Sequence, residues 1–297
     1  MASKLGVDFG GTWVRVGILA PSAGGDTLRV EKYASPGGWD EFAALLAPYA
    51  GADVDGIGIA IAGPIEDHAV VVKGPNLRWL DGRDVRRDLG KVLGKKVVVS
   101  NDMEAATEGE MARGVLRKYP WAIFDTISTG WGGNLVLDGK RVDGEPGHTN
   151  VTFASPYLCG CGNYGCNEAL YSGSHMERRI RAHLPTLPAE AGAWEPFHEA
   201  VAAGIPWAVA LLDDWAEGVG RAWANAMNRI RPLQAIVYMG TTAESLIAVP
   251  RVAQRLRATM QRICMFPEHK AESFPILQAQ EPNRSIYGAI AVYDKVA

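Results

Sequence analysis

The stretch KLGVDFGGTWVRVGILA, residues 4–20, is the clearest indication of the fold class of this chain. Apolar residues flank DFGGT, and Val14, Val16 and Ile18 alternate with other residues after it. A period of two is typical of a β-strand, and paired glycines permit a tight turn between strands. The stretch therefore predicts two strands joined by a glycine turn, with Asp8 at the end of the first strand.

The rest of the chain repeats this pattern and adds helices. WAIFDTISTGWGGNLVLDGKRV at 121–142 again predicts strand, turn and strand, and QAIVYMGTT at 234–242 predicts a strand that ends in a glycine turn. Helical spacing is evident at 39–50, 211–232 and 285–297. We expect an α/β fold with mixed sheets and a duplicated core, and the least regular part at about 184–206.

Composition restricts the class of protein. The chain has 297 residues, 47% of them apolar and 21% charged, and a net charge of -3. This describes a globular protein large enough for two domains, without the basic excess typical of nucleic-acid binding. The apolar runs are too short for a membrane span, and no signal peptide is evident at the N-terminus. Four cysteines do not make a secreted disulfide framework, so we expect a cytoplasmic protein.

The glycine turns have a chemical interpretation. Backbone N–H groups in such turns bind phosphate oxygens, Thr12 can donate a further hydrogen bond, and Asp8 can hold a hydrated Mg²⁺. DFGGT alone is equally consistent with an ordinary glycine hairpin with an acidic flank. STGWGG and YMGTT favour the phosphate interpretation, because three such turns after strands can enclose a phosphate chain and an adenosine.

A cysteine cluster lies in HTNVTFASPYLCGCGNYGCNE, residues 148–168. His148, Cys159, Cys161 and Cys166 supply one imidazole and three thiolates, the number and type of ligands for a closed structural Zn²⁺ site. A disulfide is the alternative, but a Cys-x-Cys pair is strained. A catalytic thiol would not need two further cysteines beside it. Cys264 is isolated, and we expect it to be a small buried hydrophobe.

Asp102 is the candidate base. In VVVSNDMEAA, residues 97–106, a buried strand passes into a helix at Ser100 or Asn101, either of which can cap it. Transfer of a phosphoryl group to a hydroxyl uses a carboxylate that accepts the proton. An ordinary helix-start aspartate is the alternative, and it is common.

DFGGT, STGWGG and YMGTT resemble the phosphate-1, phosphate-2 and adenosine elements of the actin/hexokinase/Hsp70 superfamily. Within it, GEPGH followed by C-x-C-G-x-x-G-C-x-E is similar to the ROK family of sugar kinases and sugar-responsive repressors, over nearly the whole chain. The resemblance implies a two-domain actin-like ATPase (ribonuclease H-like) fold with an interdomain cleft. It implies a small domain of 1–115 plus 285–297, with the phosphate-1 turn and the base. It implies a large domain of 116–284, with the phosphate-2 turn, the zinc knuckle and the adenosine site.

The resemblance also implies roles for individual residues. Asp102 would be the catalytic base and a sugar contact. The other sugar-binding residues would be Gly63, Asn76, Asn101, Glu145, His148 and Glu168. The nucleotide-binding residues would be Asp8, Gly10, Gly11, Thr12, Thr129, Gly130, Gly240 and Thr241. By composition alone, Glu145 and Glu168 are equally consistent with solvated surface glutamates.

Several residues depart from the family pattern, all of them near the expected nucleotide pocket. Trp13 stands where many relatives carry a smaller or basic residue. Ser128 and Trp131 stand where glycine and an aliphatic residue are usual, Asn134 replaces a frequent glycine, and YMGTT has one glycine. These departures bear on nucleotide preference and leave the base and zinc ligands unchanged. For Trp131 and Trp79 we favour a place in the core over a place in the pocket wall.

These observations predict an ATP-dependent hexokinase with structural Zn²⁺, with Mg²⁺ bound to its ATP, and with glucose as the leading substrate. N-acetylmannosamine, mannose, fructose and allose are alternative substrates. A non-catalytic sugar sensor is an alternative of another class, but the phosphate-1 turn begins at residue 8, ahead of which a DNA-binding domain would not fit. A zinc-stapled structural protein would leave the glycine turns unexplained. The resemblance implies a homodimer, with no nucleic-acid or membrane partner.

Overall fold

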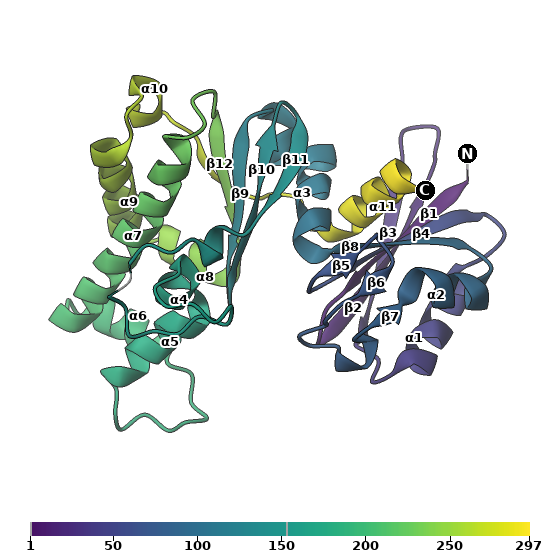
Figure 1. Ribbon diagram of the computed structural model, residues 1–297, viewed down its shortest axis with the longest axis horizontal. Helices are drawn as coiled ribbons and strands as arrows, with labels where there is room; N and C mark the ends of the chain where they lie inside the picture. The colour runs from purple at the N-terminus through teal and green to yellow at the C-terminus, as the bar shows by residue number, and fades with distance from the viewer. Residues whose placement is uncertain (1, 153) are drawn as a thin grey trace. The chain divides into compact units, whose positions relative to one another are not determined.

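The computed structural model describes residues 2–152 and 154–297, and the chain divides into two compact units. Unit 1 comprises Met1–Lys118 and Gln280–Ala297, and unit 2 comprises Tyr119–Ala279. Figure 1 labels most of the helices and strands of both units. The C-terminal segment therefore returns to the unit in which the chain begins.

Unit 1 is built on a five-stranded mixed sheet. Its strand order is β3-β2-β1-β4-β8, in which β1 pairs antiparallel with β2 and parallel with β4, and β4 pairs parallel with β8. The strands are β1 (Ser3–Phe9), β2 (Trp13–Ala20), β3 (Thr27–Ala34), β4 (Val54–Ile61) and β8 (Lys96–Asn101). A small sheet consists of β5 (Ile65–Glu66), β6 (Val70–Val71) and β7 (Arg83–Asp84). The helices are α1 (Trp39–Leu46), α2 (Val85–Leu93), α3 (Asp102–Arg113) and α11 (Arg284–Val296).

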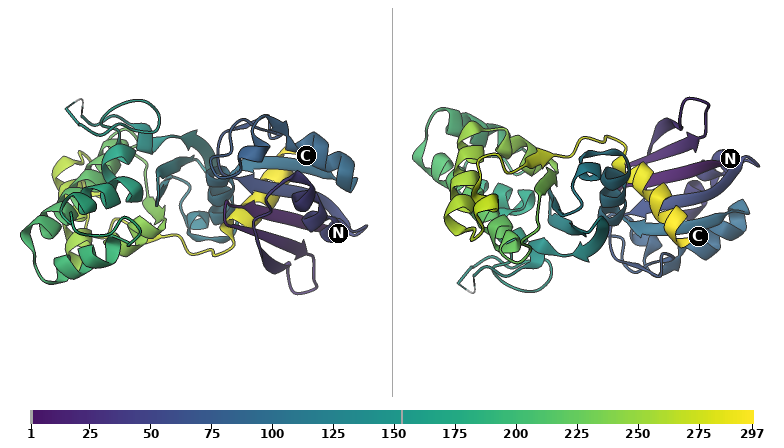
Figure 2. Two further views of the ribbon diagram at one scale, coloured as in Figure 1. Left: turned by 90° about the horizontal axis from the view of Figure 1, so that it is seen from below. Right: turned by 90° about the horizontal axis from the view of Figure 1, so that it is seen from above.

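The alternation of side chains explains how helices cover both faces of this sheet. Alternate residues such as Val7 and Ile59 form a core cluster with Phe42 of α1 and Leu89 of α2. The opposite face carries small residues such as Ala60, which packs with residues of α3 and α11. Successive side chains of a strand point to opposite faces, so one strand serves both layers. Both views of Figure 2 show α11 lying along these strands.

Unit 2 has a sheet of the same topology. Its order is β11-β10-β9-β12-β13, with antiparallel pairs β11/β10 and β10/β9 and parallel pairs β9/β12 and β12/β13. The strands are β9 (Ala122–Ile127), β10 (Trp131–Leu137), β11 (Lys140–Gly144), β12 (Ala235–Met239) and β13 (Ile276–Gln278). Two identical topologies in one chain agree with the duplicated core that the repeated turns predict.

Helices cover the sheet of unit 2, and α7 packs beside α9 (Figure 1). They are α4 (Asn167–Tyr171), α5 (Gly173–Ala182), α6 (Trp194–Ala202), α7 (Pro206–Met227), α8 (Thr241–Ile247), α9 (Pro250–Ile263) and α10 (Pro267–Lys270). The stretch expected to be the least regular, about 184–206, contains one helix that the sequence did not indicate, α6 at 194–202. The buried Phe197 docks this helix on the core, so packing stabilises a segment whose alanine- and proline-rich flanks conceal its periodicity. Cys264 is buried in the same core, as expected.

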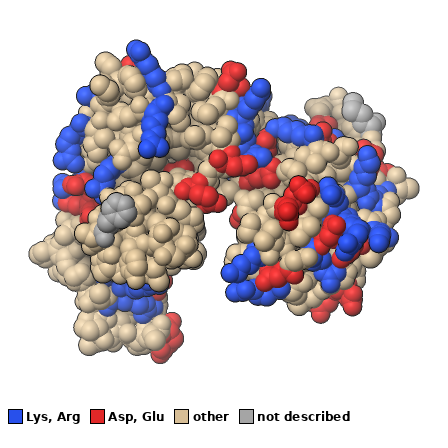
Figure 3. All heavy atoms as spheres, viewed as in Figure 1, with Lys and Arg blue, Asp and Glu red and all other residues tan. Residues whose placement is uncertain are grey.

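The surface carries charges of both signs. On the face shown in Figure 3, lysine and arginine side chains are intermingled with aspartate and glutamate. This distribution agrees with the net charge of -3. In residues 2–152 and 154–297, no helix combines the length and the hydropathy that crossing a bilayer requires.

Candidate active site

The candidate residues of unit 1, except Asn76, lie at or just after the carboxyl ends of three parallel strands. Phe9 of β1 is in register with Ile61 of β4, and Ile61 is in register with Asn101 of β8. The residues that follow these three positions therefore leave the sheet at the same edge. Ligands of open α/β sheets bind at such carboxyl ends.

The phosphate-1 turn is a tight hairpin. The Gly10 N–H donates to the Trp13 carbonyl at 3.0 Å, and the Thr12 carbonyl accepts the Ser35 N–H at 3.0 Å. A Cβ atom on Gly11 would lie 2.5 Å from the Cβ of Asn76. The absence of a side chain at Gly11 thus allows the turn and Asn76, two of the predicted ligand elements, to touch.

Asn101 connects the end of β8 to the loop that follows β4. It is the N-cap of α3, where its Oδ1 accepts the Met103 N–H at 2.8 Å. Its Nδ2 donates to the Gly63 carbonyl at 2.9 Å. An amide nitrogen carries two hydrogens, and Asn101 also hydrogen-bonds the Asp102 carboxylate, which acts to lower the pKa of Asp102. The predicted helix cap is confirmed at Asn101, whereas Ser100 donates to the Ile59 carbonyl.

Asp102 is the first residue of α3, and its carboxylate accepts the Met103 N–H at 2.9 Å. Burial raises the pKa of the Asp102 carboxyl above its ordinary value, the hydrogen bond from Met103 opposes this, and the charge of Asp8 raises the pKa further. A carboxylate with a raised pKa is a better proton acceptor. The backbone fixes its place, since a helix and a strand meet at this residue.

Asp8 has a partner that the sequence analysis missed. Arg15 donates to Asp8 Oδ2 from Nε at 2.9 Å and from Nη2 at 2.6 Å. The two residues lie directly opposite each other across the β1/β2 hairpin, so counting back from the turn would have paired them. Arg15 engages one carboxylate oxygen, and Oδ1 is the atom that remains for a hydrated Mg²⁺ to contact.

In unit 2 the phosphate-2 turn and the YMGTT turn meet. β9 and β12 are parallel neighbours, with Thr126 in register with Met239, so both turns leave the sheet at one edge. The Ser128 hydroxyl lies 3.1 Å from the Thr241 hydroxyl, and the Thr242 hydroxyl donates to the Ser128 carbonyl at 3.3 Å. Two turns far apart in the sequence thus form one polar surface. Thr129, Gly130 and Gly240 belong to it.

The cysteine cluster forms one compact group. The ligand atoms of His148, Cys159, Cys161 and Cys166 all lie within 4.8 Å of one another, and the three cysteines are not in disulfides. Cys159 Sγ is 3.4 Å from His148 Nδ1, and Cys161 Sγ is 3.7 Å from Cys166 Sγ. Tetrahedral zinc bound by sulfur and nitrogen sets neighbouring ligand atoms roughly 3.5–3.8 Å apart. The donor set and its spacing therefore fit Zn²⁺.

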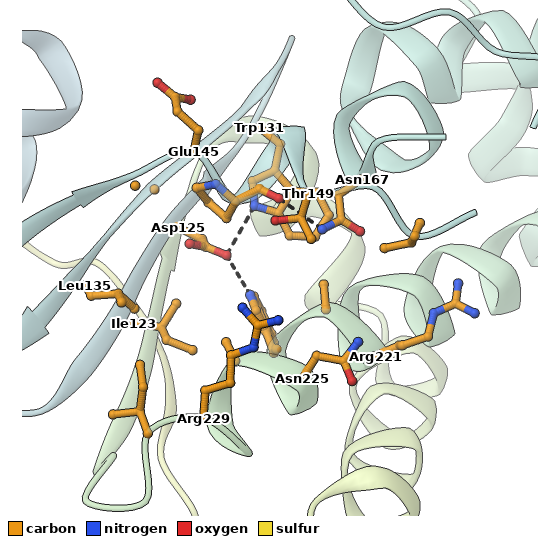
Figure 4. A pocket seen from close by; sticks show the side chains of 18 of the residues that line it. Ile123, Asp125, Trp131, Leu135, Glu145, Thr149, Asn167, Arg221, Asn225 and Arg229 are labelled. Atoms are coloured by element: carbon orange, nitrogen blue, oxygen red, sulfur yellow. Dashed lines mark hydrogen bonds between the residues drawn. The ribbon is translucent and has the colours of Figure 1, made fainter. Parts of the chain in front are cut away.

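The three predicted sugar ligands of unit 2 have different surroundings. His148 turns Nδ1 toward Cys159 and so has Nε2 for a second partner. Glu145 extends away from Asp125 in Figure 4. Glu168, in the first turn of α4, accepts the backbone N–H of Trp131 on Oε2 at 3.0 Å. The structure thus connects Glu168 directly to the phosphate-2 turn, a contact that no sequence motif indicates.

Asp125 is a further residue that the sequence analysis did not select. It is buried in β9, and its Oδ2 accepts the indole N–H of Trp131 at 3.1 Å and that of Trp223 at 2.8 Å. Burial raises its pKa to about 6, against the effect of the two indoles. Figure 4 shows Asp125 beside a cavity of about 800 Å³ between the sheet and α7. Trp131 is almost fully buried, which confirms the preferred place in the core; Trp79 is half-buried against Phe9 and Phe42.

The chain is similar to known proteins over most of its length. Residues 4–296 match the ROK family. A glucokinase from Pyrobaculum calidifontis is 30% identical over 249 residues, covering 80% of this chain and 79% of the relative. An N-acetylgalactosamine kinase from Shewanella sp. is 27% identical over 292 residues, covering 91% of each.

Solved structures agree with the sequence comparisons. The ROK hexokinase from Thermus thermophilus superposes with a TM-score of 0.83 at 26% identity, covering 99% of each chain. A ROK family glucokinase from Streptomyces griseus, solved with glucose and AMPPNP, gives a TM-score of 0.71 at 26% identity and 98% coverage of each chain. The predicted actin-like ATPase fold with mixed sheets is confirmed. The chain belongs to the ROK family.

Proposed function

We propose that the protein transfers the γ-phosphoryl group of ATP to the primary hydroxyl of a hexose, giving hexose 6-phosphate and ADP. The observation that carries this proposal is Asp102, a half-buried carboxylate with a raised pKa at the same edge of the sheet as the phosphate-1 turn. The kinase names of the relatives support the reaction class.

Asp102 would act as the general base. Its carboxylate accepts the proton of the primary hydroxyl while that oxygen forms a bond to the γ-phosphorus, and the bond from phosphorus to the β–γ bridging oxygen breaks. ADP leaves with the electron pair of that bond. Asn101 would contact the sugar with its amide group, because its helix cap and its bond to Gly63 fix the side chain.

The nucleotide would be held by backbone groups of the turns. Gly10, Gly11 and Thr12 of unit 1 would contact the phosphates, as would Thr129 and Gly130 of unit 2. Gly240 and Thr241 would lie beside the adenosine. Mg²⁺ bound with ATP neutralises phosphate charge in such transfers, and Asp8 is the carboxylate placed to orient its water shell.

The sugar would also contact residues of unit 2 and of the loops of unit 1. We assign Glu145, His148 and Glu168 to its hydroxyls, together with Gly63 and Asn76. Cys159, Cys161, Cys166 and His148 would hold Zn²⁺, which fills all four positions with protein atoms and supplies a structural crosslink. His148 Nε2 would donate to the sugar because Nδ1 faces the cysteine sulfurs.

Glucose is the first substrate to test, and an N-acetylhexosamine is the second. The relatives are named glucokinase, N-acetylgalactosamine kinase, N-acetyl-D-glucosamine kinase and N-acetylmannosamine kinase. The experiment measures ADP release with ATP and Mg²⁺ over glucose, mannose, fructose, allose and the three N-acetylhexosamines. Sugar-dependent ADP release, with phosphate on the C6 oxygen by ³¹P NMR, is the expected result. Absence of turnover with every sugar in zinc-loaded protein would contradict the proposal and favour a sugar sensor.

A further inference from the structure

One short segment contacts the phosphate-2 turn at four consecutive residues, 128–131. It runs from Cys166, a predicted zinc ligand, through α4 to the start of α5. Its hydrogen bonds run from the Gly173 N–H to the Ser128 carbonyl at 2.6 Å, and from the Ser174 hydroxyl and N–H to the Thr129 carbonyl at 2.8 and 3.3 Å. The turn is therefore held in place by the segment that follows the cysteine cluster.

Glu168 makes the most specific of these contacts. Its Oε2 accepts the Trp131 N–H at 3.0 Å, and a Cβ atom on Gly130 would lie 2.8 Å from the same oxygen. A side chain at Gly130 would therefore push the carboxylate off the turn. A hydrogen bond between a charged acceptor and a backbone N–H is stronger than one between neutral groups. Glu168 thus fixes the orientation of the peptide unit between Gly130 and Trp131.

The other carboxylate oxygen of Glu168, Oε1, faces the cysteine cluster. Cys159 Sγ lies 3.5 Å from Oε1, so a single carboxylate touches both the phosphate-2 turn and the cysteine cluster. Because α4 begins directly after Cys166, the position of Glu168 depends on the fold of that cluster. Oε1 and Oε2 belong to one rigid carboxylate, so a displacement of Oε1 also displaces Oε2 and changes its hydrogen bond with the Trp131 N–H.

We propose that Glu168 is a positioning residue for the nucleotide as well as a contact of the acceptor, and that it couples the binding of the two. Its carboxylate holds the phosphate-2 turn in the orientation that receives the phosphates, and a hydroxyl bound at Oε1 restricts the side chain and so keeps Oε2 in place on the Trp131 N–H. The identity of the two ligands rests on the proposed function; the effect of Glu168 on the turn rests on the contacts alone.

The test measures binding of ADP with Mg²⁺ by isothermal titration calorimetry, first without sugar. Glu168→Ala removes the acceptor of the Trp131 N–H and should weaken ADP binding about tenfold, as expected for a lost charge-assisted hydrogen bond. Glu168→Gln keeps an oxygen acceptor and should restore most of the affinity. Glu145→Ala is the matched control, because Glu145 is also assigned to the sugar but lies outside the segment that contacts the turn.

Two further measurements separate positioning from loss of structure. Zinc content and the circular dichroism spectrum of each variant report whether the cluster and the fold are intact. Ser174→Ala removes an independent contact to the turn, at Thr129, and should also weaken ADP binding. With glucose, or the best sugar found, the wild type should bind ADP more tightly than without it, and Glu168→Ala should lose this gain.

The outcomes distinguish the inference from the proposed function. Unchanged ADP affinity in a folded Glu168→Ala protein, or equal weakening in Glu145→Ala without sugar, would overturn the inference and leave the kinase proposal standing. A wild-type protein that binds no ADP at all would overturn both.

Discussion

The Nδ2 atom of Asn101 donates a hydrogen bond to the carbonyl oxygen of Gly63 at 2.9 Å, which joins the loop after β4 to the first turn of α3. The other end of the same amide caps the helix that Asp102 begins. One side chain therefore stabilises a helix and fixes the loop opposite the candidate base. A control variant can separate the effect of Asn101 on stability from its effect on the reaction.

Asn101→Ala should reduce both stability and turnover. Loss of the cap should lower the free energy of unfolding by about 1 kcal/mol, and turnover should fall further because Asp102 loses its fixed start of the helix. Asp84→Ala is the control, since Asp84 caps α2 by accepting the Arg87 N–H at 2.9 Å and has no assigned role in the reaction. Thermal unfolding and steady-state kinetics of the two variants provide the comparison. Equal loss of turnover in both would show that Asn101 acts through stability alone.

The pH profile should report the state of Asp102. The base must be ionised to accept a proton, and burial raises its pKa above the ordinary value of 3.8. The acidic limb of kcat/KM should therefore have its midpoint above pH 3.8, and activity should be lost as the pH falls through it. Initial rates in constant-ionic-strength buffers measure this. A limb at or below the ordinary carboxyl pKa would remove Asp102 from the role.

Asp125 should make stability depend on pH in an unusual direction. Its folded pKa of about 6 lies above its ordinary 3.8, so the folded state binds the extra proton, and the stabilisation is present at low pH and lost as the pH rises through 6. Relative to Asp125→Asn, the wild type should gain about 1 kcal/mol of unfolding free energy between pH 7.5 and pH 5.

The measurement for Asp125 is denaturant unfolding of both proteins at the two pH values. Comparison with the asparagine variant cancels the titration of all other groups. A difference between the two proteins that is constant with pH would contradict the assigned state of this carboxyl.

Removal of zinc should affect unit 2 selectively. Cys161→Ser should lower zinc content and the midpoint of thermal unfolding, because a structural zinc site contributes directly to folding. Cys264→Ala is the control, since this cysteine lies in the core of the same unit and outside the cluster. It should lose stability through its cavity and keep its zinc. Full zinc content in Cys161→Ser by mass spectrometry under native conditions would contradict the predicted ligand set.

The sequence predicted those parts of the structure that depend on local pattern. The two strand–turn–strand units, the cap at Asn101 and a long helix, expected at 211–232 and found at 206–227, all follow from periodicity, capping residues and glycine position. The close grouping of His148 with the three cysteines follows from residue types that have one common use. These features need no knowledge of contacts between distant segments.

The features that were missed depend on such contacts. The bond of Glu168 to the Trp131 N–H requires that a helix after the cysteine cluster return to a turn thirty-seven residues earlier. The burial of Asp125 depends on Trp223, which lies on a helix far along the chain. No local pattern encodes either pairing. Arg15 is different, because its pairing with Asp8 follows from the register of one hairpin and was within reach of the sequence.

The central claim is that Asp102 takes the proton of the acceptor hydroxyl. The most direct measurement compares kcat for Asp102→Asn with the wild type at saturating ATP and sugar, with sugar affinity measured separately by calorimetry. Asparagine keeps the size and the hydrogen bond to Met103 but cannot accept the proton. We expect kcat to fall about 10²–10⁴-fold while the sugar still binds. A variant with kcat near that of the wild type would contradict it.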